Sequence, residues 1–338
     1  MADELARWAG ERAPSLLARA EGEALAVLRD ALVAAALDRP REGRPPDEPD
    51  PPTAKRDPPL AKPGPPPPTG EALWAYGVSR ADAPRPEGLS GVVPSAPVTR
   101  VEAGELAALV SSVPLAEFAE EPLRRNLNDL TWLGRVARAH EAVLERALST
   151  TAIVPLRLCT IYESEESVRE MLEREQDAFV EALEVLDGRQ EWGVKLLVDP
   201  ERLAEEARSR SSEAAALQDE LEGRSGGSAY LVRRRLERHV REAASSVAGE
   251  VAEQVHARLQ DWAIDAVSRR PQNRELSGHE GDMLLNGAYL VEAERVDGFR
   301  ELVTGLEDRY RSLGARLELT GPWPPYNFVP HGGAAAIA

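Results

Sequence analysis

The sequence contains little cysteine, few aromatic residues and no long hydrophobic run. Cys159 is the single cysteine, so the chain can form neither an intrachain disulfide nor a multi-cysteine metal site, which fits a reducing cytoplasm. No window approaches about 18 uninterrupted apolar residues, and we therefore expect no membrane span. We also expect no secretory signal, because the first residues include acids and lack an apolar run followed by a cleavage site.

Basic side chains are also in deficit. The chain carries 41 lysines and arginines against 58 aspartates and glutamates, a net charge of −17. This charge repels polyphosphates and anionic surfaces, so we expect neither nucleic acid nor a lipid membrane as a partner. Hydrophobic residues make up 42% of the 338 residues, which is enough for buried cores, and the length favours about two domains.

Proline separates the N-terminal part of the chain from the rest. Between Pro40 and Pro68, 13 of 29 residues are proline, and charges of both signs are mixed among them. Such a segment has too little apolar surface to offset the entropy cost of ordering. We therefore expect a proline-rich linker over residues 39–70. Before it, leucines and Trp8 at helical spacing predict an amphipathic helix over residues 1–38.

Residues 71–187 carry the patterns of a first α+β domain. The periodicities predict strands at 72–79, 97–101, 106–113 and 152–162, one helix from after Pro122 to Leu148, and another over 165–187. The second helix combines an apolar stripe with a strongly negative face, since residues 163–187 contain ten acids against Arg169 and Arg174. A solvated surface and a partner-docking face both account for this negative charge.

Residues 188–330 predict a second α+β domain. Apolar residues from Leu203 to Leu221 alternate steps of four and three, which is typical of a coiled-coil seam, and a helix capped by Ser228 should run to about Arg270. Together they predict a long antiparallel helical hairpin at about 200–270. Strands at 191–199, 288–292 and 315–321 and a helix at 296–313 complete a ferredoxin-like sheet with helices on one face, followed by a tail at 331–338.

Motifs for catalysis, cofactors and metals are missing from the sequence. There is no Walker motif and no G-x-G-x-x-G between a strand and a helix, so the ordinary phosphate-binding loops are absent. His140 begins a run similar to the zinc motif H-E-x-x-H, but Leu144 stands in place of the second histidine. We expect His140 to be hydrogen-bonded at the edge of an apolar stripe and Cys159 to be a buried, inert thiol. The sequence thus predicts no catalytic residue, no cofactor and no metal.

Two further features leave alternatives open. Arginines 233–235 and Arg238 follow a glycine turn at a helix start, where they either bind an anion or remain solvated and form local ion pairs. Trp323, Tyr326 and Phe328 lie on a backbone stiffened by prolines. These aromatic side chains either clamp the final strand to its own domain or provide an external docking surface.

Several segments resemble the gas vesicle protein F/L family in both sequence and order: LWAYGV, HEAVLERAL, VPLRLCTIY, GGSAYLVRRR, NGAYLV and LTGPWPPYNF. Together they span about residues 72–330, and GGSAYL and GPWPPYNF are the most distinctive. The chain departs from the family's usual arginine-phenylalanine-glycine-threonine pattern at residues 157–160, where Leu158 and Cys159 replace phenylalanine and glycine.

The resemblance implies an accessory protein of gas vesicle formation that is cytoplasmic and associated with gas vesicles. It implies binding to the small, hydrophobic major shell protein during assembly, in an adaptor or chaperone-like role, with other accessory proteins as further partners. The alternative is a minor structural component retained in the vesicle shell. Enzymatic activity is a distant third reading, because family members are not known as enzymes. The resemblance also implies two α+β domains, one of them modified ferredoxin-like, with a helical hairpin.

Two groups of residues are the expected partner-binding sites: Glu170, Glu173, Asp177 and Glu181 on the acidic helix, and Trp323, Tyr326 and Phe328 near the C-terminus. The first group offers negative charge and the second offers rigid apolar area. A net charge of −17 also suits a protein that keeps an aggregation-prone apolar subunit dispersed.

Removing residues 1–69 should leave the folded body intact and reduce its recruitment into an assembly complex. The proline-rich linker contributes little packed core, whereas the leading helix raises the local concentration of a second partner site. Thermal unfolding of the full-length and truncated proteins, with binding to the major shell protein and to other accessory proteins, tests this. A large loss of cooperative unfolding on truncation would show instead that the leading helix docks onto the body.

Overall fold

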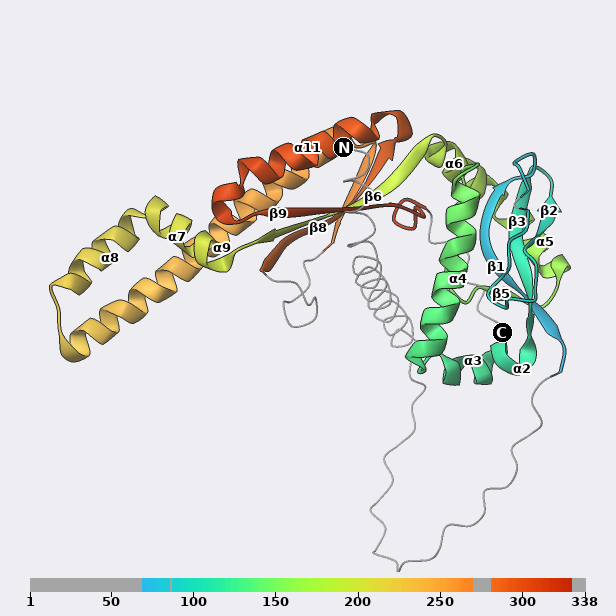
Figure 1. Cartoon of the computed structure of the whole chain (residues 1–338), viewed down its shortest axis with the longest axis horizontal. Helices are drawn as coiled ribbons and strands as arrows, with labels where there is room; N and C mark the ends of the chain where they lie inside the picture. Colours follow the sequence, from blue (N-terminus) through green and yellow to red (C-terminus); the bar gives the residue numbers. More distant parts are fainter. Residues whose placement is uncertain (1–68, 86, 270–280, 330–338) are drawn as a thin grey trace, which may run out of the picture.

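The computed structural model describes residues 69–85, 87–269 and 281–329, which form two antiparallel sheets with their helices (Figure 1). The helix expected over 1–38, nearly all of the linker expected over 39–70, and the tail at 331–338 lie outside the described residues. Within the described ranges, every helix is too short or too polar to cross a bilayer.

The first sheet is covered by helices on both of its faces. Its strand order is β2-β3-β1-β4, with β5 also paired to β1, and the strands are β1 (Glu71–Arg80), β2 (Thr99–Ala103), β3 (Leu106–Pro114), β4 (Val154–Pro155) and β5 (Ile161–Tyr162). Trp74 and Tyr76 pack on one face with α2 (Leu115–Phe118), α3 (Glu120–Asn126) and α4 (Leu130–Leu148). Ala75 and Val78 pack on the other with α5 (Glu165–Arg174) and α6 (Gln176–Leu186). Burial on both faces explains why β1 is almost uninterruptedly apolar.

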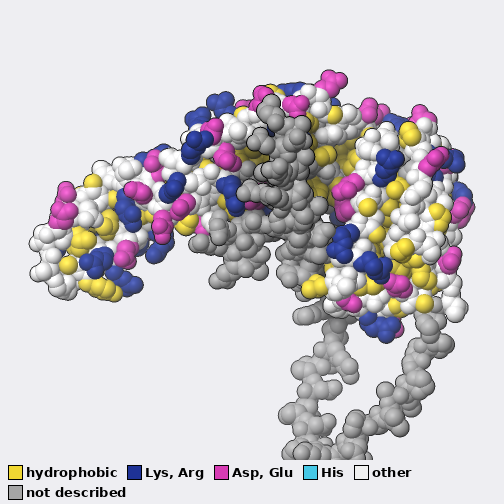
Figure 2. Space-filling view, viewed as in Figure 1, with side chains coloured by type: hydrophobic (Ala, Val, Ile, Leu, Met, Phe, Trp, Pro, Cys, Tyr) yellow, Lys and Arg dark blue, Asp and Glu magenta, His cyan; other side chains and the backbone are white. Residues whose placement is uncertain are grey.

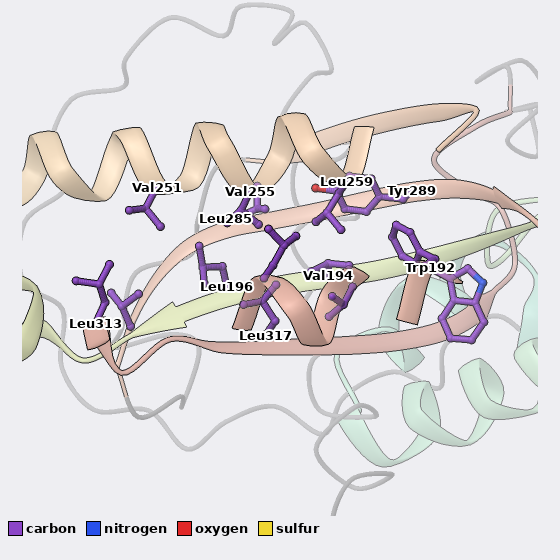
Figure 3. Close-up of a cluster of buried hydrophobic side chains, with 14 of the residues drawn as sticks. Trp192, Val194, Leu196, Val251, Val255, Leu259, Leu285, Tyr289, Leu313 and Leu317 are labelled. Carbon is purple, nitrogen blue, oxygen red and sulfur yellow. The ribbon is translucent and has the colours of Figure 1, made fainter. Parts of the chain in front are cut away.

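The second sheet has the order β7-β8-β6-β9, and all its pairings are antiparallel. Its strands are β6 (Arg189–Val198), β7 (Asp265–Arg269), β8 (Asp282–Glu292) and β9 (Arg316–Trp323). The hairpin helices connect β6 to β7, and α11 (Val296–Arg309) lies between β8 and β9. Two short 3-10 helices, Ala293–Arg295 and Arg311–Leu313, flank α11. Alternate residues of the central strand β6 point into a core under α11 and the hairpin's long helix, as Trp192, Val194 and Leu196 show in Figure 3.

The helical hairpin extends from the second sheet to one end of the molecule (Figure 1). Two helices, α7 (Pro200–Arg210) and α8 (Ser212–Glu222), pack along one long helix, α9 (Gly226–Trp262). Near the sheet, Val251, Val255 and Leu259 of α9 belong to the sheet's core. Toward the tip the hairpin has a separate, small core made of Ala214, Leu217, Val232, Leu236 and Val240.

Several predicted helices are divided in the structure. The helix expected from Pro122 to Leu148 is interrupted after α3, because Asp129 caps a new helix by accepting from the backbone N–H groups of Thr131 and Trp132. The predicted hairpin helix likewise breaks at Ser211, whose hydroxyl caps α8 by accepting from Ala214 N–H at 3.1 Å. The acidic helix is two helices, α5 and α6, which meet at Glu175.

The long hairpin helix differs from its prediction at both ends. It begins at Gly226, and Ser228 lies inside its first turn, where its hydroxyl donates to the carbonyl of Ser225. It ends at Trp262, because the backbone N–H of Ile264 bonds to the carbonyl of Leu290 and carries the chain into β7. Beyond Trp262, where the prediction continued the helix, residues 265–269 form strand β7, and Arg270 lies outside the described residues.

The strand predicted over residues 152–162 is also wrong in part, since it consists of β4 and β5 joined by a turn. Thr160 closes this turn with its backbone N–H and its hydroxyl, both of which donate to the carbonyl of Arg157. Cys159 sits in the turn with φ of 66°, in the left-handed region that favours glycine. This conformation gives a physical reason for the glycine found at this position in the family pattern.

Cys159→Gly should unfold at a higher urea concentration than Cys159→Ala, with a difference in the free energy of unfolding of about 0.5–1 kcal/mol. Both variants lose the packing of the half-buried thiol against its apolar neighbours. Their difference therefore reports the cost of a Cβ atom at positive φ, reduced by the larger chain entropy that glycine gives the unfolded state. Equal stability of the two variants would show that the turn carries no such cost.

Candidate partner-binding site

The acidic pair of helices is held on the first sheet by its apolar side. Ser164 caps α5 by accepting from the backbone N–H of Ser167 at 3.2 Å. The inward residues of both helices are buried: Val168, Met171, Leu172, Phe179, Ala182, Leu183 and Leu186. The outward residues are therefore fixed by the core beneath them.

The four carboxylates predicted from the sequence lie together on this outward side. Glu170 and Glu173 are exposed on α5, and Asp177 and Glu181 are exposed on α6. We call these four residues the acidic face. Within the described part of the chain none of them forms an ion pair, because the nearby arginines are bound to other acids: Arg169 to Glu165 and Glu166, and Arg174 to Glu175. The charge of the acidic face is therefore not compensated by an ion pair within the described residues.

The three aromatic residues predicted as partner-binding are not free in the structure. Each is partly buried, and Trp323 donates its indole N–H to the hydroxyl of Thr320 at 3.1 Å. Tyr326 packs against the cluster under α4, and Phe328 packs against the cluster under α5 and α6. We call residues 323–329 the C-terminal segment. Trp323 stays with its own sheet, where it pairs with Glu191 of β6, as the predicted clamp to its own domain requires. Tyr326 and Phe328 differ from that prediction, because the apolar clusters that receive them belong to the first sheet.

A network of hydrogen bonds beneath the C-terminal segment was not predicted from the sequence. The hydroxyl of Tyr326 donates to Glu141 of α4 at 3.0 Å. The backbone N–H of Asn327 donates to Glu191 of β6 at 3.1 Å, and its side-chain amide donates to the same carboxylate. Glu191 is buried in spite of its charge. Its place at the start of a predicted strand whose other residues are mostly apolar is the signal that sequence reasoning could have used.

Burial changes the acid–base behaviour of this network. It raises the pKa of Glu141 to about 7, an effect that the Tyr326 hydrogen bond opposes and that the charges of Glu145 and Glu191 reinforce. Burial, with Glu141 close by, also raises the pKa of Tyr326 well above its ordinary value. The groups with altered acid–base behaviour thus belong to the place where both sheets, through Glu141 and Glu191, meet the C-terminal segment.

His140 and Cys159, which the sequence analysis considered as metal ligand and reactive thiol, are packed against other parts of the protein. His140 is fully buried, rather than at the edge of an apolar stripe; it accepts from the indole of Trp74 at 3.0 Å and lies 3.2 Å from the carbonyl of Leu156. Burial lowers its pKa to about 4, and burial raises the pKa of Cys159 to about 12. Cys159 is half-buried and lies in a turn instead of a strand. Among residues 69–85, 87–269 and 281–329, no three histidine, cysteine or acidic side chains are grouped as metal ligands.

Comparison with known proteins places these features in a family. Residues 72–330 match the family described as gas vesicle synthesis protein GvpL/GvpF. The chain is 40% identical to gas vesicle protein L of a Streptomyces species, over 77% of this chain and 94% of that protein. It is 31% identical to gas vesicle protein F of the same organism, over 76% of this chain and 99% of that protein.

Solved structures share the fold. The crystal structure of the gas vesicle protein GvpF from an Anabaena species superposes with a TM-score of 0.60 at 21% identity, covering 77% of this chain and 99% of that one. GvpF from Microcystis aeruginosa superposes with a TM-score of 0.55 at 19% identity, covering 76% and 98%. The mixed helix-and-sheet architecture described above matches these structures.

Glu141→Gln should make the protein more stable than the wild type at pH 8, by about 1–3 kcal/mol, and leave stability almost unchanged near pH 4. The raised pKa means that the folded wild type binds a proton that the unfolded chain, with an ordinary value of 4.5, releases earlier. Stability contributed by this proton is lost as pH rises from about 4.5 to about 7, and glutamine removes the loss while it can still accept from Tyr326.

Denaturant unfolding of the wild type and of Glu141→Gln measures the difference in their stability. The range of about pH 4–8 covers the pKa of Glu141 in both the unfolded and the folded protein. Glu121→Gln is the matched control, because Glu121 is exposed on α3. A pH dependence that is the same in the wild type and in Glu141→Gln would contradict the buried-carboxylate account.

Proposed function

The chain belongs to the gas vesicle synthesis protein GvpL/GvpF family and is involved in gas vesicle formation, and we propose that it binds the hydrophobic major shell protein during assembly. Its role is that of an adaptor or chaperone-like accessory protein that works in the cytoplasm, at the growing vesicle, and without enzymatic turnover. Other gas vesicle accessory proteins are further partners in this proposal.

The observation that carries the proposal is the acidic face. Glu170, Glu173, Asp177 and Glu181 form no ion pairs in the described part of the chain, and a rigid apolar core fixes the helices that bear them. Charged groups of this kind steer a partner and set its orientation. The net charge of −17 keeps the resulting complex dispersed while the apolar subunit waits for assembly.

The partial burial of the three aromatic residues supports a division of roles between the two predicted sites. Trp323, Tyr326 and Phe328 fasten the C-terminal segment, so we assign them to shape and the acidic face to binding. The strand order β7-β8-β6-β9, with helices between β6 and β7 and between β8 and β9, supports a ferredoxin-like description of residues 188–330. It also supports their treatment as a second domain after residues 71–187.

Reversing the acidic face should weaken binding of the major shell protein. We expect the variant Glu170→Lys, Glu173→Lys, Asp177→Lys and Glu181→Lys to lose at least about tenfold in affinity, because repulsion replaces attraction at four positions. Replacing Arg233, Arg234 and Arg235 by alanine is the comparison and should have a smaller effect. Binding of both purified variants to the purified shell protein is measured after circular dichroism shows that each is folded.

The opposite ranking of these two variants would overturn the assignment of the acidic face. A second measurement separates the adaptor role from its alternative, a minor structural component of the shell. Intact vesicles are washed and the protein retained in them is quantified against the shell protein. Loss on washing is expected of an adaptor, whereas stoichiometric retention would support the structural role.

A further inference from the structure

A basic stripe lies on α9 near the tip of the hairpin, on the side that faces away from α8. The side toward α8 is marked by Val232, Leu236 and Val240, which are buried in the small hairpin core. At 3.6 residues per turn, the opposite side of the helix is formed by Tyr230, Leu231, Arg234, Arg238 and Arg241. All five side chains are exposed, and we call them the basic stripe.

The arginines of the basic stripe have no acidic partner in the described part of the chain. The guanidinium of Arg234 lies over the ring of Tyr230, with its Cζ 5.8 Å from the ring centroid. Other arginines of the hairpin are paired, among them Arg210 with Glu206 at 2.7 Å and Arg224 with Glu220 at 2.8 Å. Arg234, Arg238 and Arg241 are thus exposed, and the local ion pairs expected for Arg234 and Arg238 are not formed within the described residues.

Large apolar side chains are exposed beside these arginines. Tyr230 and Leu231 retain 56% and 64% of their accessible surface. Figure 2 shows hydrophobic side chains next to Lys or Arg side chains at the hairpin end of the molecule. Tyrosine and arginine together are typical of the centres of protein interfaces, and both are enriched among residues whose truncation costs the most affinity.

The acidic face at the other end of the molecule complements this stripe. Its carboxylates are spaced by three residues on α5 and by four on α6, and the stripe's arginines are spaced by four and three. Val185 follows Glu181 by one helical turn and is 37% exposed, which offers an apolar spot for Tyr230 or Leu231. Figure 1 shows the hairpin tip and α5 at opposite ends of the longest axis, so the two surfaces of one copy cannot meet.

We propose that the basic stripe of one copy docks on the acidic face of a second copy of this chain. The contact joins two different surfaces, and either a reciprocal antiparallel dimer or an open chain of copies satisfies it. A nucleic acid or an anionic membrane fits less well, because the stripe offers only three arginines to an extended polyanion, which the net charge of −17 repels.

High salt should weaken this contact. Exposed ion pairs are individually weak, so the interaction depends on several pairs acting together with the apolar side chains. At about 0.1 M salt the Debye length is about 10 Å, so the net charge of each copy is screened while close pairs still attract. At about 1 M salt, where the Debye length is about 3 Å, association should weaken at least tenfold.

Charge exchange between purified variants tests the proposal. The stripe variant carries Arg234→Glu, Arg238→Glu and Arg241→Glu, and the face variant carries lysine in place of the four acids of the acidic face. A seven-site variant combines both sets. The matched control carries Glu250→Lys, Glu253→Lys, Asp261→Lys and Glu301→Lys, which reverse four exposed acids elsewhere. Sedimentation equilibrium at about 0.1 M salt gives the average mass of each protein over a range of concentrations.

We expect the wild type and the control to associate with increasing concentration, to at least twice the monomer mass. The stripe variant alone and the face variant alone should each associate at least tenfold more weakly. An equimolar mixture of the two should associate again, and so should the seven-site variant, because both restore opposite charges across the contact.

Three results would overturn the proposal: a wild type that stays monomeric at every concentration, a mixture that fails to restore association, or a control that loses it. Binding of the stripe to single-stranded RNA or to phosphatidylserine vesicles, with a monomeric wild type, would identify a polyanion site in its place. None of these measurements includes the shell protein, so the self-association stands or falls separately from the proposed function. The shell protein and the second copy would compete for the acidic face.

Discussion

The structure depends on two carboxylates, half-buried Glu141 and buried Glu191, that lie where its two sheets meet. Glu141 comes from α4 of the first unit, and Glu191 comes from the central strand of the second. Removing such groups from water is costly unless donors satisfy them, and the donors here are Tyr326 and Asn327 of the C-terminal segment. The C-terminal segment therefore contributes to both units. Its hydrogen bonds, and the apolar clusters that receive Tyr326 and Phe328, help to fix how the two sheets lie relative to each other.

Charge is distributed unevenly over this frame. Many surface arginines pair with a glutamate or aspartate three or four residues away on the same helix, as Arg124 does with Glu120 and Arg300 with Asp297. Such pairs contribute little stability and no long-range field. The acidic face and the basic stripe are two groups of exposed charges that form no such pair within the described residues. The proposed role of the acidic face rests on its position on a rigid pair of helices as well as on its charge.

Sequence patterns predicted the elements better than their ends or their neighbours. Strands β1, β3 and β6 follow from their apolar runs, and the hairpin follows from heptad spacing. The breaks at Asp129 and Ser211 depend on side-chain caps that compete with helix continuation, and periodicity does not report such competition. The four acids of the acidic face could be proposed from the sequence because their charge is visible there, and their role stays a prediction. The role of Tyr326 was missed, because its partner Glu141 is 185 residues away along the chain and only tertiary packing brings them together.

The hairpin's separate core has a consequence for how the molecule opens. Its buried side chains are alanines, valines and leucines with no aromatic ring, and they share no member with the core that holds the base of α9. A small aliphatic core of this kind favours sub-global opening, in which the tip exchanges its amide hydrogens at a lower free energy than the sheet. The long helix would then fray from its Gly226 end while its last turns remain protected. Any ligand bound at the tip would slow this exchange locally, so the exchange rates of the tip amides would show whether a ligand is bound there.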